Sequence, residues 1–171
     1  MLALICCILC LYQQPRTPDL NAQRAAMKKL EFLVGKWAGE ARMLRGTGDP
    51  LVMMQTEEVQ YKLDGLVLVI EGVGKADGKP ALQALGVVSY DDETGTYHMR
   101  AFNDGRFLET EVKLIDKGFT WGFALGQYRT STVMRIDDKG DWTEQHEITI
   151  GNQAPRKYME LSVSREKSPT K

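Results

Sequence analysis

The 171-residue sequence has little of the chemistry on which most enzyme classes depend. It contains three cysteines, all within the first ten residues, and two histidines, His98 and His146. If the N-terminal segment is removed, no cysteine remains, which excludes disulfides, thiolate metal sites and a cysteine nucleophile. Two histidines without cysteine leave no zinc-type cluster, so we expect no metal site.

The sequence also lacks an excess of charge of one sign. Its formal net charge is −1, and acidic and basic residues are interspersed, so no nucleic-acid partner is expected. The glycines of Gly72-Val73-Gly74 precede no helical pattern, which excludes a phosphate-binding loop. No nucleophile elbow of a serine hydrolase is present. The length is that of one domain with a sizeable core.

The N-terminus differs from the rest of the chain. Met1 to Tyr12 is almost wholly apolar, and the first charged residue is Arg16. The run is shorter than the roughly 20 residues of a membrane span, so residues 1–14 are predicted to be a signal peptide and 15–20 a linker. The processed protein would then be secreted or periplasmic, without a membrane span. Because the run opens without Lys or Arg and lacks a clean cleavage site, a cytoplasmic or membrane-tethered product is the alternative.

A short helix is predicted before the first strand. Asp19 or Asn21 can cap it, and Gly35 supplies a left-handed stop after Val34. The apolar positions of the segment fall on one face: Ala22, Ala26, Leu30, Leu33 and Val34. This amphipathic pattern predicts packing against the domain, and everything up to about Asp19 is expected to lie outside it.

Beyond Trp37, turn signals such as Asp64-Gly65, Asp77-Gly78 and Asp104-Gly105 recur at regular intervals. Ten β-rich segments lie between them: 36–45, 51–63, 66–75, 81–90, 96–103, 106–115, 118–125, 127–137, 141–150 and 156–165. A meander of this length closes to avoid exposed edges. The sequence thus predicts an all-β fold, an up-and-down antiparallel barrel of about ten strands over residues 21–165, with a tail at 166–171.

Alternation within the strands predicts which side chains face the interior. In the ninth segment Trp142, Glu144, His146, Ile148 and Ile150 share a face, and the opposite face is wholly polar. A barrel interior is the default ligand site. The candidate ligand-binding residues are Arg100, Phe119, Trp121, Tyr128, Trp142, Glu144 and His146. Arg100 belongs to this set only if its face of the fifth strand points inward. The opposite face, which carries Tyr97, Met99 and Ala101, is the competing candidate for the inward side.

The run Gly35-Lys36-Trp37-Ala38-Gly39-Glu40 after a short helix resembles the calycin superfamily of lipocalins and fatty-acid-binding proteins, and also the nitrobindin-type haem barrels. Together with Gly118 to Phe123 and Met159 to Arg165, it is similar to a group of lipocalin-like exported bacterial proteins. The resemblance implies structural roles for Gly35, Trp37 and Gly39, and a late arginine, Arg165, packed across Trp37.

The resemblance to nitrobindins implies haem, which those barrels bind through a histidine on a late strand. Here the last strand contains no histidine, and Ala41 replaces a glycine of the nitrobindin motif. Haem ligation by His146 is therefore an alternative, and no other cofactor is expected.

Three hypotheses about function remain open. The first, which the resemblance favours, is a carrier or sensor of a small hydrophobic or aromatic molecule. The second is a cavity enzyme of isomerase or cyclase type, with His146 and Glu144 as acid and base and Arg100 holding an anion. The third is an interaction module whose barrel is filled by side chains. The identity of the ligand and the oligomeric state stay open.

Overall fold

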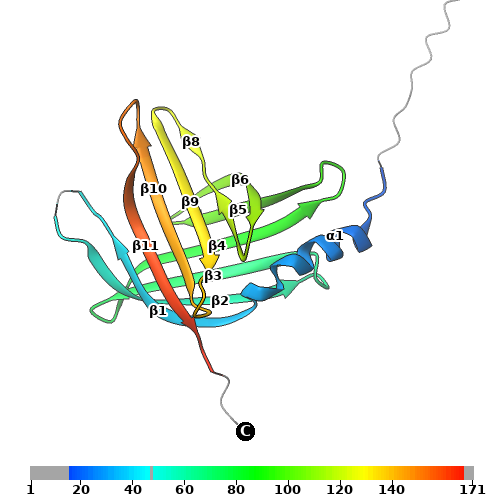
Figure 1. The fold of residues 1–171 in the computed structure, drawn as a ribbon, viewed down its shortest axis with the longest axis horizontal. Helices are drawn as coiled ribbons and strands as arrows, with labels where there is room; N and C mark the ends of the chain where they lie inside the picture. The colour runs from blue at the N-terminus through cyan, green and yellow to red at the C-terminus, as the bar shows by residue number, and fades with distance from the viewer. Residues whose placement is uncertain (1–15, 47, 168–171) are drawn as a thin grey trace, which may run out of the picture.

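The strands form a closed antiparallel ring in the computed structural model, which describes residues 16–46 and 48–167 (Figure 1). The strands are β1 (Gly35–Met43), β2 (Leu51–Lys62), β3 (Val67–Ala76), β4 (Lys79–Asp91), β5 (Thr96–Asn103), β6 (Arg106–Ile115), β7 (Gly118–Trp121), β8 (Ala124–Leu125), β9 (Tyr128–Ile136), β10 (Trp142–Ile150) and β11 (Arg156–Arg165). Each pairs with the next in the order β1 to β7, then β9, β10 and β11, and β11 pairs with β1. The predicted ten-stranded up-and-down barrel is confirmed, with β8 as an extra piece on β9.

The seventh predicted strand, 118–125, is interrupted and forms β7 and β8. Between them Phe123 bonds to Thr130 of β9 through both its N–H and its carbonyl oxygen. A Cβ at Gly122 would lie 2.2 Å from the Thr130 carbonyl oxygen, so only glycine allows the chain to pass so near β9 there.

The ring is weakest where β6 meets β7. Only three residue pairs join these strands, from Lys113–Thr120 to Ile115–Gly118. Further along, the hydroxyl of Thr110 donates to the Gly122 carbonyl oxygen at 2.6 Å, and no ladder continues among the described residues. Trp121, the last residue of β7, lies where the pairing between β6 and β7 has ended.

The predicted helix consists of α1 (Leu20–Met27) and a 3₁₀ segment, η1 (Lys28–Leu33). The Asp19 carboxylate caps α1 by accepting from the N–H groups of Asn21 and Ala22. Gly35 follows with φ +136°, a value that favours glycine. The buried residues are Ala26, Met27, Leu30 and Leu33. Ala22, expected on the packed face, is exposed in the first turn of α1.

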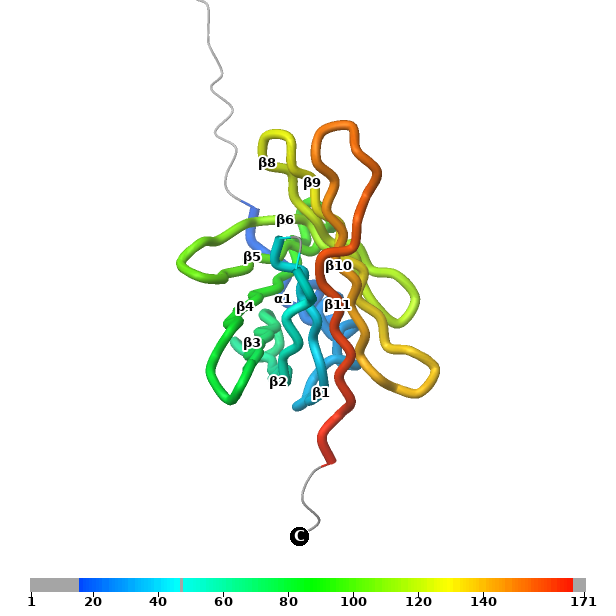
Figure 2. Tube along the Cα trace, turned by 90° about the vertical axis from the view of Figure 1, so that its left-hand side faces the viewer, coloured from blue at the N-terminus to red at the C-terminus, as the bar shows by residue number. Residues whose placement is uncertain are grey.

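This helical segment covers one end of the barrel, called here the closed end (Figure 1). The hydroxyls of Tyr61 and Tyr97 donate to the carbonyl oxygens of Met27 and Ala26, at 2.7 and 2.8 Å. These bonds satisfy carbonyls at the end of α1. The C-terminal strand β11 ends at the same end of the barrel (Figure 2). The opposite end, where the β3–β4 and β10–β11 turns lie, is called the open end.

The chain before α1 is attached to the outside of the barrel. Arg16 forms an ion pair with Asp92 in the β4–β5 turn at 2.8 Å, and the Asp19 N–H donates to the same carboxylate. Residues from Arg16 to Asp19 therefore lie outside the ring, as expected, but touch it. The predicted signal peptide lies outside the described residues.

Trp37 and Arg165 close the barrel beneath this helical segment. Trp37 is 1% exposed, donates from Nε1 to the Leu33 carbonyl oxygen at 2.9 Å, and meets Trp142 edge to face. Arg165, its partner on β11, places Cζ 4.1 Å from the indole centroid. The guanidinium donates to the carbonyl oxygens of Val34 and Phe32, which satisfies two groups that η1 leaves free. This is the packing that the resemblance implied.

We expect coupling between Trp37 and Arg165 when both are replaced. In a double-mutant cycle with Trp37→Phe and Arg165→Ala, the coupling free energy should be about 0.5–2 kcal/mol, as for a guanidinium over an aromatic face. Urea unfolding of the four proteins measures it. Arg42→Ala, which removes an exposed arginine elsewhere, provides the control and should show no coupling with Trp37→Phe. Additive effects of the Trp37 and Arg165 substitutions would contradict the expectation.

Candidate functional site

A group of hydrogen-bonded polar side chains from β9 and β10 lies inside the barrel. Glu144 accepts from Trp142 Nε1 at 3.0 Å and lies 2.9 Å from His146 Nε2. His146 Nδ1 is 2.9 Å from the Thr132 hydroxyl. Because a carboxylate is only an acceptor, the neutral imidazole is assigned its proton on Nε2, and Nδ1 then accepts from Thr132. The chain Trp142–Glu144–His146–Thr132 fixes the orientation of all four side chains.

Two polar side chains of β2 that were not among the predicted site residues face the same interior. Gln55 is 2% exposed and Glu57 is 8% exposed. Gln55 Nε2 donates to Glu57 Oε1 at 2.7 Å. The Gln55 Oε1 atom is buried and accepts no hydrogen bond from any described residue. We call Gln55, Glu57, Thr132, Glu144 and His146 the interior polar cluster.

Glycines make room for the β2 side chains. Gly72 and Gly74 of β3 pair with Glu57 and Gln55. A Cβ at Gly72 would lie 2.7 Å from Glu57 Oε2, and one at Gly74 would lie 2.7 Å from Gln55 Oε1. The Gly-x-Gly spacing on β3 therefore accommodates two buried polar groups on the neighbouring strand. This spacing is the signal by which these residues could have been found from the sequence.

Burial and a like charge perturb the acids of this interior. Desolvation, and secondly the charge of Glu144, raise the pKa of Glu57 to about 8, while the hydrogen bond from Gln55 opposes this rise. The same two causes, in the same order, raise the pKa of Tyr158. The Glu57 carboxyl is therefore mostly protonated at neutral pH, and the nearby charge of Glu144 contributes to this.

Aromatic rings surround His146 on the side of the open end. The rings of Trp121 and Tyr158 meet the imidazole at centroid distances of 6.0 and 5.9 Å, both edge to face. Trp121 and Tyr158 are only half-buried, and 14% of the Glu144 side chain is exposed. Side chains next to His146 are therefore partly open to solvent.

The facing wall carries small residues. Gly86 and Ala101 occupy inward positions on β4 and β5, and Gly72 lies beside them on β3. A Cβ at Gly86 would meet its nearest neighbour, Met99 Sδ, at an ordinary 3.6 Å. From these three positions no large side chain extends into the interior.

The structure brings some of the predicted site residues together and separates others. Glu144 and His146 face inward, as the alternation of β10 predicted, and Trp121 lies against them. Trp142 and Phe119 are 1% and 3% exposed and belong to the packed core nearer the closed end. Tyr128 is 44% exposed and pairs with Ile150 at the far end of β10, away from His146.

The inclusion of Arg100 was wrong. Tyr97 and Met99 take the inward positions of β5, at 8% and 5% exposure, so period two places Arg100 on the outer face. There Arg100 bonds to Glu109 of β6, and its Cζ lies 5.9 Å from the Phe107 ring centroid. Burial of the guanidinium would cost its hydration, whereas on the outer face it keeps both water and the ion pair with Glu109.

The residues do not fit a haem or a metal ion. Both nitrogens of His146 are already engaged, with Glu144 and Thr132, so an iron ligand would have to break one of these bonds. The remaining histidine, His98, is exposed on the outer face of β5. Within residues 16–46 and 48–167, no group of three or more acidic, histidine or cysteine side chains is placed to hold a metal ion.

Hollows on the outer surface lie elsewhere. One of about 600 Å³ lies outside β9, β10, β11 and β1, with charged walls that include Arg42, Arg135 and Glu160. Another of about 580 Å³ lies outside β3 to β6, beside Phe102 and Phe107. The lining of the first hollow includes Glu144 of the interior polar cluster, whereas His146 and Glu57 line neither hollow. No helix within the described part of the chain is long and apolar enough to cross a membrane.

Comparisons with known proteins show the fold and no more. No family model matches the sequence, and neither does any curated protein. Among solved structures, the chain is similar to the crystal structure of Rv2717c from M. tuberculosis, with a TM-score of 0.63 and 15% identity. The match covers 83% of this chain and 98% of that one. At this identity the likeness shows the fold alone, an antiparallel β-barrel like that of Rv2717c.

Proposed function

We propose that this protein binds a small, mostly apolar or aromatic molecule inside the barrel, against Trp121, Tyr158 and the interior polar cluster. The observation that carries the proposal is the half-burial of inward-facing aromatic rings beside buried polar groups. Ligand sites commonly combine an apolar lining with a few oriented polar groups. A carrier or a sensor would use such a site.

The hypothesis of a filled barrel has less support. Beyond the level of His146, inward residues such as Thr130 and Ile148 are only half-buried. In a packed interior these positions would be fully covered, as Thr132 and Met134 are nearer the closed end, at 0% exposure. The gradient of burial along β9 and β10 supports a filled lower half and an accessible upper half.

The hypothesis of acid–base catalysis is also less well supported. A general base needs a nitrogen within hydrogen-bond reach of the substrate. Here Glu144 and Thr132 use both nitrogens of His146, which suits an oriented polar group in a binding site.

The expected export of the protein stays a prediction, because its signal lies outside the described residues.

Binding should be detectable with a neutral apolar fluorescent dye, N-phenyl-naphthylamine. We expect the fluorescence of the dye to rise when the protein is added. The tryptophan emission of the protein, to which Trp121 contributes, should fall. Ala101→Trp, which fills space on the facing wall of the interior, should weaken dye binding about tenfold or more, since it removes several apolar contacts of the dye. Fluorescence titration of both proteins gives the two dissociation constants.

Ala124→Trp is the matched control, because it makes the same change at an exposed position of β8. It should leave dye binding within about twofold, as expected for a surface change away from the site. Equal affinities of the wild-type protein and Ala101→Trp would contradict an interior site. Circular dichroism establishes that both variants fold.

A further inference from the structure

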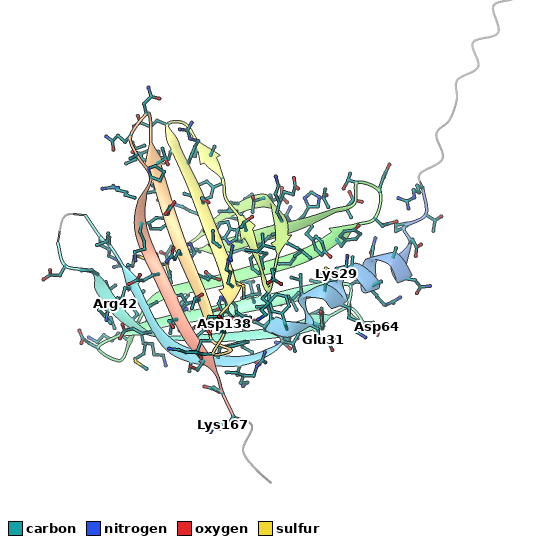
Figure 3. All side chains as sticks on the ribbon, in the orientation of Figure 1. Lys29, Glu31, Arg42, Asp64, Asp138 and Lys167 are labelled. Atoms are coloured by element: carbon teal, nitrogen blue, oxygen red, sulfur yellow. The ribbon has the colours of Figure 1, made fainter. Side chains whose placement is uncertain are left out.

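No basic side chain of the barrel strands is buried, and the one that pairs with the inward-facing Ile148, Arg156, lies near the open end. Every Lys and Arg of strands β1 to β11 is exposed. Figure 3 labels two of the exposed basic residues, Arg42 of β1 and Lys167 beyond β11, and two exposed acidic residues, Asp64 and Asp138. No guanidinium or ammonium group of a described strand is therefore buried beside the interior polar cluster.

The negative side chains are distributed differently. Glu57 is buried and Glu144 is largely covered, and both face the interior. The one basic group beside them is His146, already bonded to Glu144. Two carboxyl groups with one imidazole give an interior that is short of positive charge, and a buried charge without a partner is costly.

The cluster is also short of hydrogen-bond donors. Gln55 Oε1 is buried without a donor, and Gln55 uses its amide group on Glu57. A buried acceptor that lacks a donor is destabilising, so native interiors rarely keep one. A ligand that carries several N–H groups would correct this deficit by donating one of them to Gln55 Oε1.

From these placements we propose that the ligand is a small organic cation, whose ammonium or amidinium head lies between Glu57 and Glu144. This inference rests on the proposed function. The apolar or aromatic body of the cation lies against Trp121 and Tyr158, whose ring faces also attract positive charge. Fatty acids and other amphipathic anions are disfavoured, because like charges inside the barrel repel them.

In the absence of such a ligand, protonation removes the charge of Glu57. A bound ammonium group next to the carboxyl favours its ionised form and displaces the proton. The charged group that acts on Glu57 is Glu144 of β10; His146 is bonded to Glu144, and Tyr158 of β11 contacts His146. Binding of a cation near neutral pH should thus release a proton, whereas binding of a neutral molecule of the same shape should not.

Three probes with one skeleton test the charge preference: naphthylmethylamine, naphthylmethanol and naphthoate, which are cationic, neutral and anionic at pH 7. In isothermal titration calorimetry we expect the amine to bind at least about tenfold more tightly than the alcohol, as a charge-assisted hydrogen bond implies, and naphthoate to bind most weakly. If the alcohol or naphthoate binds as tightly as the amine, the cation proposal is wrong while the proposed function survives. If none of the three binds, both are wrong.

Variants assign the preference to particular residues. Glu57→Gln and Glu144→Gln should each weaken binding of the amine by about tenfold or more and change binding of the alcohol by less than about threefold. Glu58→Gln makes the same change one residue along β2, on the outer face, and should change neither. The Glu57 variant should fold, because its amide can keep the bond to Gln55. Equal losses for amine and alcohol would contradict a role for these carboxylates in charge selection.

Calorimetry in two buffers of different ionisation enthalpy counts the protons released. We expect release on binding of the amine to the wild-type protein, and a marked loss of that release in Glu57→Gln. The same release from both proteins would show that the bound head does not lie beside Glu57.

Discussion

Replacing Trp37 with alanine should lower the free energy of unfolding by about 3–5 kcal/mol. The indole is 1% exposed, and it contacts the Trp142 ring on one side and the Arg165 guanidinium on the other. Its removal would leave a cavity between the barrel and η1 and would also free the Leu33 carbonyl oxygen, which now accepts from Nε1. Both losses fall on the closed end, where the helical segment is attached.

Chemical unfolding followed by circular dichroism measures this change. Trp121→Ala is a matched control, since Trp121 is half-buried at the open side of the interior and should cost less than half as much. A loss of less than about 1 kcal/mol for Trp37→Ala would show that the closed end does not depend on this residue.

Raising the pH from 5 to 9 should destabilise the protein, and Glu57→Gln should remove much of that dependence. The pKa of Glu57 is raised from 4.5 to about 8 in the folded protein. Between these values the folded state binds more protons than the unfolded state, so stability falls as the pH rises. The contribution is fully present below about pH 4.5 and lost above about pH 8, and amounts to a few kcal/mol.

Thermal unfolding at several pH values, compared between the wild-type protein and the variant, isolates this contribution. The variant should gain stability relative to the wild-type protein as the pH rises from 5 to 9. Glu58→Gln, at an exposed position on the same strand, should follow the wild-type curve. Parallel curves for Glu57→Gln and the wild-type protein would mean that Glu57 is not buried in its protonated form.

The sequence by itself determined most of the architecture. Turn residues with positive φ, such as Asp64 and Gly65, ended the strands close to the predicted places, because few other residues adopt that conformation. The alternation of β10 placed Glu144 and His146 inward, since only one of its faces carries large apolar residues. Gly35 and Trp37 indicated the closed end.

The tertiary structure alone decided which polar groups meet. On β2, Met53, Gln55, Glu57 and Val59 oppose Val52, Met54, Thr56 and Glu58, so each face has two apolar and two polar residues, and alternation cannot tell which is inward. Closure of the ring through β1 and β11 then brings Glu57 near Glu144, 87 positions further along the chain. Local periodicity carries no information on such a contact, because it depends on the curvature of the whole sheet.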